Sequence, residues 1–186
     1  MKVQIVSLQN SQRCAIQNLG FEVLKTIDLV RDKGFTLGFA ESCTGGLLST
    51  EFTKVSGVSD TFVGSVVCYS NDVKQNILGV DSNTLKNFGA VSGECAKELV
   101  AGVLKNLKTS LAIAITGVAG PKGGSVNKPV GTVFISVGGT DLAKTKTVIK
   151  NYCHSFGEIN REDIQKAACA AALEHLQNLI IEMKDL

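Results

Sequence analysis

The chain is organised around one short stretch, Ala40-Glu41-Ser42-Cys43-Thr44-Gly45-Gly46. An apolar run over residues 35–39 precedes it and is short enough to be a buried strand, and residues 47–52 can continue as a helix. A strand that ends in a serine and two glycines exposes a hydroxyl beside bare backbone N–H groups. The amino end of the following helix favours negative charge at the same place. The stretch therefore predicts a ligand site or, more simply, a helix whose N-cap is Ser42 or Thr44.

Length and composition indicate a single soluble domain. The 186 residues suffice for one well-cored domain and are few for two. Apolar residues make up 44% and charged residues 19%, which argues against disorder. A formal charge of +2, without a long basic run, argues against nucleic acid as the main partner. No apolar run reaches the roughly 18 residues that span a bilayer, and polar residues interrupt any signal peptide near the amino end. We expect a cytoplasmic protein without a membrane partner.

The cysteine pattern and the mean hydropathy predict whether the chain binds a metal and whether it forms an oligomer. The six cysteines form no Cys-x-x-Cys pair, and the two histidines, His154 and His175, are distant from each other in sequence. This is not a zinc pattern, so we predict no metal and reduced thiols. A mean hydropathy of +0.18 indicates a buried subunit surface and hence a homo-oligomer.

Strand-like and helix-like segments alternate along the chain. Apolar positions at helical spacing predict long helices over residues 16–33, 92–107 and 161–183, and shorter ones after Asn71 and Asp81. Buried strands are predicted over residues 35–40, 62–69, 110–116, 131–138 and 145–153, the last two forming a hairpin. This order predicts a single three-layer α/β/α domain over residues 16–186 with a mixed, mostly parallel sheet. Residues 1–15 are predicted to be an edge strand or a leader.

A second cluster reads Tyr69-Ser70-Asn71-Asp72-Val73-Lys74, where a strand ends and a helix begins. In parallel α/β sheets, ligands gather at the carboxyl ends of the strands. Ser42 and Tyr69 both lie at such ends, and Lys74 follows about one helical turn later. The alternative is a solvated lysine and an aromatic residue at a rim.

A third cluster reads Thr116-Gly117-Val118-Ala119-Gly120-Pro121-Lys122-Gly123-Gly124. A strand followed by such a loop can form an anion-binding nest of backbone N–H groups. The cluster matches neither the P-loop ending nor the dinucleotide fingerprint. The alternative is a long surface hairpin, although loops of this length are usually functional or disordered.

Five motifs together resemble a known family in their order and spacing: Glu41-Ser42-Cys43-Thr44-Gly45-Gly46, Tyr69-Ser70-Asn71-x-x-Lys74, Gly89-Ala90-Val91-Ser92, Thr116-Gly117-x-Ala119-Gly120-Pro121 and Lys128-Pro129-Val130-Gly131-Thr132-Val133. The family is the CinA C-terminal domain, whose stand-alone members are nicotinamide-nucleotide amidases. The resemblance covers about residues 16–180, and residues 1–15 lie outside it.

The resemblance implies hydrolysis of the carboxamide of nicotinamide mononucleotide, a small-molecule nucleotide, to nicotinate mononucleotide and ammonia, without a cofactor. By the family pattern, Ser42 is the nucleophile, Lys74 its base and Tyr69 a third member near both. The chain departs from the pattern near its last helix. Arg161 keeps the family's first arginine, whereas Gln165 replaces the second, which bears on recognition of the phosphate or the pyridine.

The implied chemistry makes demands on the residues. Amide hydrolysis without a metal needs an activated nucleophile, an oxyanion site and a proton for the departing ammonia. A lysine can act as a base near neutral pH only where a pocket lowers the pKa of its amine by roughly 3 units, or about 4 kcal/mol. Backbone N–H groups around Cys43 and Thr44 are candidates for the oxyanion site. The loop 117–124, helped by Lys122, Lys128 or Arg161, is the candidate phosphate site.

The predicted oxyanion and substrate-binding residues are Cys43, Thr44, Gly45, Gly46, Asn71, Thr116, Gly117, Ala119, Gly120, Lys128 and Arg161. Two rival functions stay open. One is a non-catalytic, competence-associated module that binds nucleotides, which Gln165 favours. The other is a cysteine enzyme that uses Cys43, although no histidine is near it in sequence.

Overall fold

A computed structural model of the chain describes residues 4–7, 18–141, 145–157 and 159–183. In these residues one sheet has the strand order β1-β6-β5-β4-β2-β3. The strands are β1 (Gln4–Ser7), β2 (Leu37–Glu41), β3 (Phe62–Val67), β4 (Leu111–Gly117), β5 (Thr132–Thr140) and β6 (Thr147–Ser155). The pairs β1–β6, β2–β3 and β2–β4 are parallel, and β4–β5 and β5–β6 are antiparallel. The sheet is mixed, as predicted, and its late hairpin is β5–β6.

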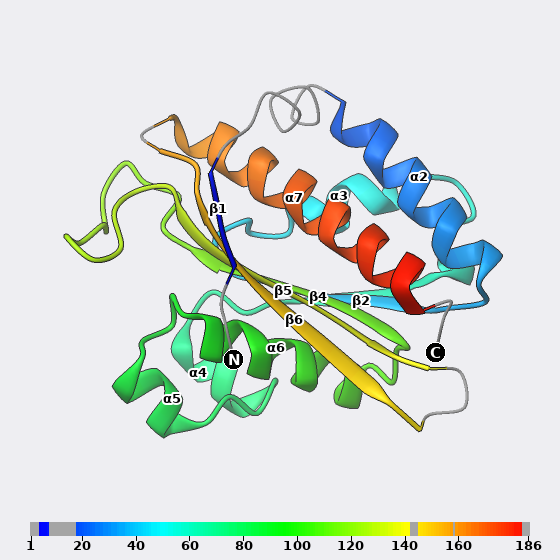
Figure 1. Cartoon of the computed structure of the whole chain (residues 1–186), viewed down its shortest axis with the longest axis horizontal. Coiled ribbons are helices and arrows are strands. Elements are labelled where there is room, and N and C mark those ends of the chain that lie inside the picture. The colour runs from blue at the N-terminus through cyan, green and yellow to red at the C-terminus, as the bar shows by residue number, and fades with distance from the viewer. Residues whose placement is uncertain (1–3, 8–17, 142–144, 158, 184–186) are drawn as a thin grey trace.

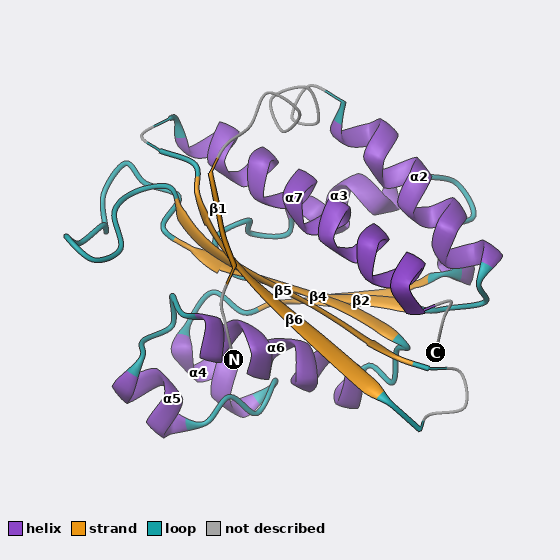
Figure 2. Ribbon diagram, viewed as in Figure 1, coloured by secondary structure: helices purple, strands orange, loops and turns teal. Residues whose placement is uncertain are grey.

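Helices cover both faces of the sheet (Figure 1). On one face lie α2 (Leu19–Asp32), α3 (Leu47–Thr53) and α7 (Arg161–Glu182), and on the other lie α4 (Asn71–Asn76), α5 (Ser82–Asn87) and α6 (Gly93–Asn106). A short 3-10 helix, η1 (Val58–Asp60), precedes β3. Figure 2 shows the resulting order of layers, helix, sheet and helix. The predicted three-layer α/β/α domain is therefore confirmed. None of the helices in the described part of the chain has both the length and the apolar composition needed to cross a membrane.

The central strands β2 and β4 are buried almost throughout because both faces of the sheet are covered. Two apolar clusters fill the space between the layers, one beneath α2 and α7 and the other beneath α6. Gly38 in β2 brings α6 close to the sheet: a Cβ there would lie 3.0 Å from side-chain atoms of Val103 and Leu107. This packing holds the carboxyl ends of β2 and β4 at one fixed edge of the sheet.

The amino-terminal segment is described only in part. Gln4–Ser7 pairs in parallel with β6 at the edge of the sheet. Residues 1–3 and 8–15 of the predicted leader, the start of the helix predicted from residue 16, and residues 184–186 of the predicted domain lie outside the described residues.

Two buried histidines meet between the sheet and α7. The Nε2 atoms of His154 on β6 and His175 on α7 lie 2.8 Å apart, and the His175 ring stacks on Tyr152 at 3.5 Å. In this contact the Nε2 of one imidazole donates a proton and the Nε2 of the other accepts it. A second proton, on the accepting nitrogen, would break this hydrogen bond. Burial lowers the pKa of His154 to about 4. Burial, together with the nearby His154 and Lys150, lowers the pKa of His175 to about 3.

We expect the free energy of unfolding to fall as the pH drops from about 6.5 towards 4. The unfolded chain protonates both imidazoles near their ordinary pKa of about 6.5, whereas the folded chain keeps them neutral, so acid favours unfolding. Two such groups give a slope approaching roughly 2–3 kcal/mol per pH unit below pH 6. Urea unfolding at several pH values measures this slope, and it should be smaller in the double variant His154→Leu/His175→Leu. Imidazole NMR signals that titrate near pH 6.5 in the folded protein would contradict the expectation.

Candidate active site

Two buried polar side chains meet at the carboxyl end of β2. Ser42 opens the serine turn (residues 42–46), which links β2 to α3. Lys74 lies on α4, whose N-cap Ser70 accepts a hydrogen bond from the backbone N–H of Val73. The Nζ of Lys74 is 3.0 Å from the Oγ of Ser42, although the two residues are 32 positions apart. The sequence-predicted nucleophile and base are thus in hydrogen-bond contact.

The amine of Lys74 is buried among oxygen atoms. Its side chain is only 1% exposed, and within the described residues it forms no salt bridge. The Nζ also contacts the carbonyl oxygens of Cys68 and, at 3.3 Å, Tyr69. Carbonyl oxygens can only accept, and a neutral amine has two N–H donors and one lone pair. In the structure the Nζ donates to the Oγ of Ser42 as well. Lys74 can take the hydroxyl proton only in its neutral form, in which two N–H groups serve the carbonyls and the lone pair faces the hydroxyl.

The amino end of α3 is occupied by the protein's own carboxylate. Glu41, fully buried, accepts hydrogen bonds from the backbone N–H groups of Leu48 at 3.0 Å and Ser49 at 2.9 Å, and from the Ser49 hydroxyl. The predicted preference of this helix end for a negatively charged group is met by the carboxylate of Glu41, from within the chain. Glu41 also ties α3 to the end of β2 and so fixes the turn between them.

The two glycines of the serine turn take backbone conformations that other residues rarely adopt. Gly45 has φ +64° and Gly46 has φ +99°, which is the left-handed region that favours glycine. Gly46 is the N-cap of α3, so the prediction of Ser42 or Thr44 at that place is wrong. Ser42 is thereby free to face Lys74.

Cys43 is unsuited to act as a nucleophile. The residue is buried, and burial raises the pKa of its thiol to about 12. A thiol must be deprotonated to attack, and this one stays protonated at neutral pH. The geometry therefore favours Ser42 over its neighbour.

Gln165 on α7 supports the serine turn from the other side. Its Nε2 donates a hydrogen bond to the carbonyl oxygen of Cys43 at 2.8 Å. The position at which a second arginine was expected thus holds the backbone next to Ser42. No sequence pattern predicts this contact, because the two residues are 122 positions apart.

A pocket of about 260 Å³ opens beside Ser42 and Lys74. This is just below the roughly 300–1,000 Å³ of typical small-molecule sites. Its lining joins the serine turn, the end of β4, the glycine loop (residues 117–131) and the start of α7. The lining residues are Ser42, Cys43, Tyr69, Lys74, Ala90, Val91, Thr116, Gly117, Val118, Ala119, Gly120, Lys122, Gly123 and Arg161. Ala90 and Val91 were not predicted as site residues, although the Gly89–Ser92 motif pointed to their segment.

Arg161 crosses the mouth of this pocket. It is the first residue of α7, and its guanidinium donates to the carbonyl oxygen of Gly120 at 2.8 Å. A second guanidinium nitrogen lies 3.4 Å from the hydroxyl of Tyr69. The side chain of Tyr69 is mostly exposed. Tyr69 thus contacts Lys74 through its carbonyl oxygen, presents its phenol to Arg161, and lines the same pocket as Ser42 and Lys74.

Five predicted binding residues lie outside the described lining of this pocket: Thr44, Gly45, Gly46, Asn71 and Lys128. The ammonium of Lys128 donates to the carbonyl oxygen of Phe88 at 2.7 Å and so anchors the glycine loop to the preceding segment. Thr116 does line the pocket, and its hydroxyl donates to the carbonyl oxygen of Ala90 at 2.8 Å.

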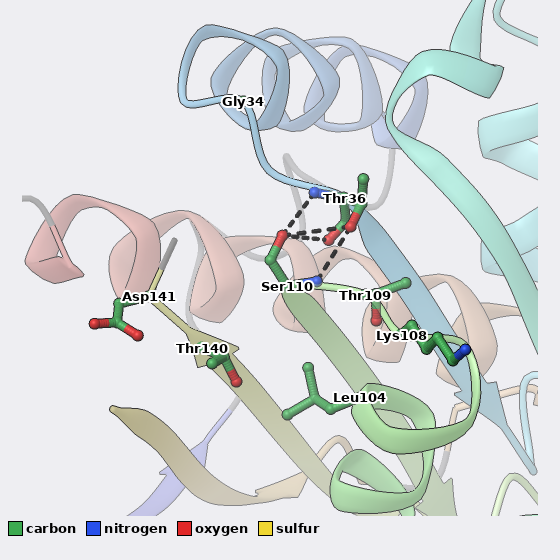
Figure 3. Close-up of a pocket in the computed structure, with 8 residues that line it drawn as sticks. All are labelled: Gly34, Thr36, Leu104, Lys108, Thr109, Ser110, Thr140 and Asp141. Atoms are coloured by element: carbon green, nitrogen blue, oxygen red, sulfur yellow. Dashed lines mark hydrogen bonds between the residues drawn. The ribbon is translucent and has the colours of Figure 1, made fainter. Parts of the chain in front are cut away.

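A larger hollow, of about 470 Å³, lies at the opposite end of the sheet (Figure 3). Thr36 and Ser110 there bond mutually: the N–H of Thr36 donates to the Ser110 hydroxyl at 2.7 Å, and the N–H of Ser110 donates to the Thr36 hydroxyl at 3.1 Å. The carboxylate of Asp141 is bonded to Thr145 and Lys146. Because these polar groups are hydrogen-bonded to neighbouring groups of the chain, the described residues of this hollow do not pair a nucleophile with a base as Ser42 and Lys74 do in the smaller pocket.

Comparisons with known proteins agree with one another. The CinA C-terminal domain matches residues 22–180. A CinA-like protein of Pseudothermotoga lettingae is 42% identical over 139 residues, which cover 75% of this chain and 34% of that protein. A putative competence-damage inducible protein of Caldicellulosiruptor saccharolyticus is 40% identical over 97% of this chain and 42% of its own length. The chain thus spans about a third to two fifths of these two relatives.

Solved structures show the same fold at nearly full length. The competence/damage inducible protein CihA from Agrobacterium tumefaciens is 35% identical and superposes with a TM-score of 0.81 over 87% of this chain and 94% of that one. A competence-damaged protein superfamily member from Escherichia coli is 28% identical, with a TM-score of 0.74 over 96% of this chain and 95% of that one.

Proposed function

Because this chain belongs to the CinA C-terminal domain family, we propose that it hydrolyses the carboxamide of nicotinamide mononucleotide to nicotinate mononucleotide and ammonia. The observation that carries the proposal is the buried contact of 3.0 Å between the Oγ of Ser42 and the Nζ of Lys74. A serine hydroxyl is a weak nucleophile until an adjacent base removes its proton, and Lys74 is the base in reach. Reduced cysteines and the soluble substrate suit a cytoplasmic enzyme.

The first half of the reaction forms an acyl-enzyme. The Oγ of Ser42 attacks the carboxamide carbon, and the hydroxyl proton passes to the Nζ of Lys74. We assign stabilisation of the oxyanion to the backbone N–H groups of the serine turn, at Cys43 and Thr44. The C–N bond then breaks and the same proton passes to the departing nitrogen. Ammonia leaves, and an ester joins the nicotinoyl carbon to Ser42.

The second half restores the enzyme. A water molecule attacks the ester carbon and gives a proton to Lys74. The bond from carbon to Oγ breaks, Oγ takes the proton back, and nicotinate mononucleotide leaves as the acid. The sum is amide plus water giving acid plus ammonia, with no other reactant.

Arg161 and the glycine loop are suited to the substrate's phosphate. Arginine has five N–H donors in a planar fork, and Arg161 directs only two of its nitrogens to Gly120 and Tyr69. Donors therefore remain for a phosphate at the mouth of the pocket. Lys122 on the same loop adds a positive charge.

Incubating the purified protein with nicotinamide mononucleotide and measuring ammonia tests the proposal. We expect ammonia and nicotinate mononucleotide in equal amounts. Free nicotinamide, which has the same amide and lacks the ribose phosphate, is the matched control and should react at least about tenfold more slowly, because it forgoes the binding energy of the phosphate. If the purified protein releases no ammonia from nicotinamide mononucleotide, the proposed activity is wrong.

A second function is a non-catalytic module that binds the nucleotide. Gln165 favours it, because an amide that holds the Cys43 carbonyl stands where the family's second arginine was expected. Such a module would bind nicotinamide mononucleotide in calorimetry, leave it unchanged, and bind it equally well after Ser42→Ala.

A further inference from the structure

The contacts of the Lys74 amine fit an ammonium. Its Nζ contacts three oxygen atoms: the hydroxyl of Ser42 at 3.0 Å, the carbonyl of Tyr69 at 3.3 Å, and the carbonyl of Cys68. An ammonium has three N–H donors and no lone pair, so it can donate to all three oxygens. In that form it cannot take the proton of Ser42. Catalysis by Lys74 therefore needs a step that removes one of its own protons.

The titratable groups packed against Lys74 do not supply a positive charge that would remove this proton. Glu41, at the end of β2, is a carboxylate bound to the amino end of α3. Asp72, on the same helix as Lys74, is exposed to solvent. Three buried thiols interact electrostatically with Lys74, and burial raises the pKa of each, so they are neutral near pH 7: Cys43, Cys68 and Cys95. None of these described neighbours is a cation.

The charges that line the pocket are of one sign. Its described lining holds Arg161 and Lys122 besides Lys74, and no aspartate or glutamate. The proposed substrate carries two charged groups, a phosphate and the pyridinium ring that bears the amide. Arg161 and Lys122 suit the phosphate and offset its charge. No carboxylate of the lining offsets the positive charge of the ring, which must lie at the end of the substrate next to Ser42.

We propose that the pyridinium ring of the substrate expels a proton from Lys74 and so creates the base that activates Ser42. This inference rests on the proposed function. The amide carbon must come within about 3 Å of the Oγ of Ser42 to react. The Nζ of Lys74 is 3.0 Å from that oxygen. The ring that bears the amide is then held roughly 6 Å from the amine.

Repulsion between the ring and an ammonium is strong at this place. The side chain of Lys74 is 1% exposed, so solvent shields the two charges weakly. The repulsion shifts the balance from ammonium to amine by at least about tenfold. One N–H bond of the ammonium breaks, the proton leaves to water, and the lone pair remains facing the hydroxyl of Ser42. A carboxamide on a cationic ring thus activates its own base, whereas the same amide on a neutral ring leaves Lys74 protonated.

Calorimetry of the Ser42→Ala variant tests this step, because the variant binds the nucleotide without cleaving it. Titrations in buffers of different ionisation enthalpy, from pH 7 to pH 9, give the number of protons released per nucleotide bound. Reduced nicotinamide mononucleotide is the matched ligand, since it has the same amide, ribose and phosphate on a neutral ring. We expect the oxidised nucleotide to release at least about half a proton more than the reduced one, at the pH of the largest difference.

The double variant Ser42→Ala/Lys74→Met identifies the source of the proton. Methionine has a similar length and no amine, so the difference in proton release between the two nucleotides should vanish. A difference that persists in the double variant would overturn the inference, because the proton would then come from another group. Equal proton release by the two nucleotides in Ser42→Ala would overturn it as well.

Single-turnover rates of the wild-type enzyme give a second measurement, which decides alone if Ser42→Ala binds too weakly for calorimetry. The rate at saturating enzyme reports the bound complex, and the rate at limiting enzyme reports the free enzyme. The rise of the rate with pH should lie at least about one pH unit lower at saturating enzyme. Two rises that coincide, in an enzyme that releases ammonia, would overturn this inference and leave the proposed function intact. A wild type that releases no ammonia would instead overturn the proposed function itself.

Discussion

Ser42→Ala is expected to abolish the release of ammonia from nicotinamide mononucleotide. The substitution removes only the hydroxyl, so no acyl-enzyme can form, and the loss should reach at least about a thousandfold. The fold should survive, because the serine turn is held by Glu41 and Gln165 rather than by the Ser42 side chain. Steady-state rates and circular dichroism measure the two effects.

Cys43→Ser is the matched control for that experiment. It changes the neighbouring residue, whose thiol is buried and protonated, and the activity should survive. Near wild-type activity in Ser42→Ala would refute the serine mechanism. Complete loss in Cys43→Ser, with the fold intact, would support the thiol mechanism instead.

Lys74→Arg is expected to lose activity by two or more powers of ten. Arginine keeps a positive charge of similar reach, but its guanidinium does not deprotonate in the working pH range and so cannot take the proton of Ser42. If Lys74 only attracted the phosphate, arginine would largely replace it, with a modest rise in KM and little change in kcat. The kinetic constants of the variant therefore separate a base from a binding charge.

Two further variants are controls for this test. Lys74→Met fills the buried site with a side chain of similar length and no amine, and it should be as inactive as Lys74→Arg while remaining folded. Lys122→Arg, at an exposed lysine of the same pocket, should keep most of the activity. A fully active Lys74→Arg enzyme would exclude the proposed base.

The layers of the fold could be predicted because the deciding signals are local. The strands β2 and β4 are buried on both faces, so their sequences are continuous apolar runs bounded by turn residues. Helix α7 follows its N-cap Asn160, whose side chain accepts a hydrogen bond from the N–H of Asp163 at 2.9 Å, as an N-cap signal predicts. Ser42 and Tyr69 were predicted at strand ends, with Lys74 one helical turn further on, and β2 and β3 are adjacent and parallel. The roles of Ser42 and Lys74 as a pair came from the resemblance to the family.

The finer details of the site depend on where side chains point, and this is fixed only by tertiary packing. Glu41 turns back onto α3 because the two glycines of the serine turn take left-handed conformations. Lys128 stands in a sequence motif, yet its ammonium reaches Phe88, 40 residues away. The contact between His154 and His175 joins a strand to a helix across the core, and no spacing in the sequence announces it.

The burial of Lys74 without a described counter-ion has a consequence for turnover. The substrate amide is neutral, whereas the product is a carboxylate formed within reach of an amine that can hold a proton. Shielding by solvent is weak at a side chain that is 1% exposed, so an ammonium there attracts the new anion more strongly than the amide that entered. For the proposed reaction we therefore expect product inhibition by nicotinate mononucleotide, and we expect departure of the product, rather than cleavage of the amide, to limit the cycle.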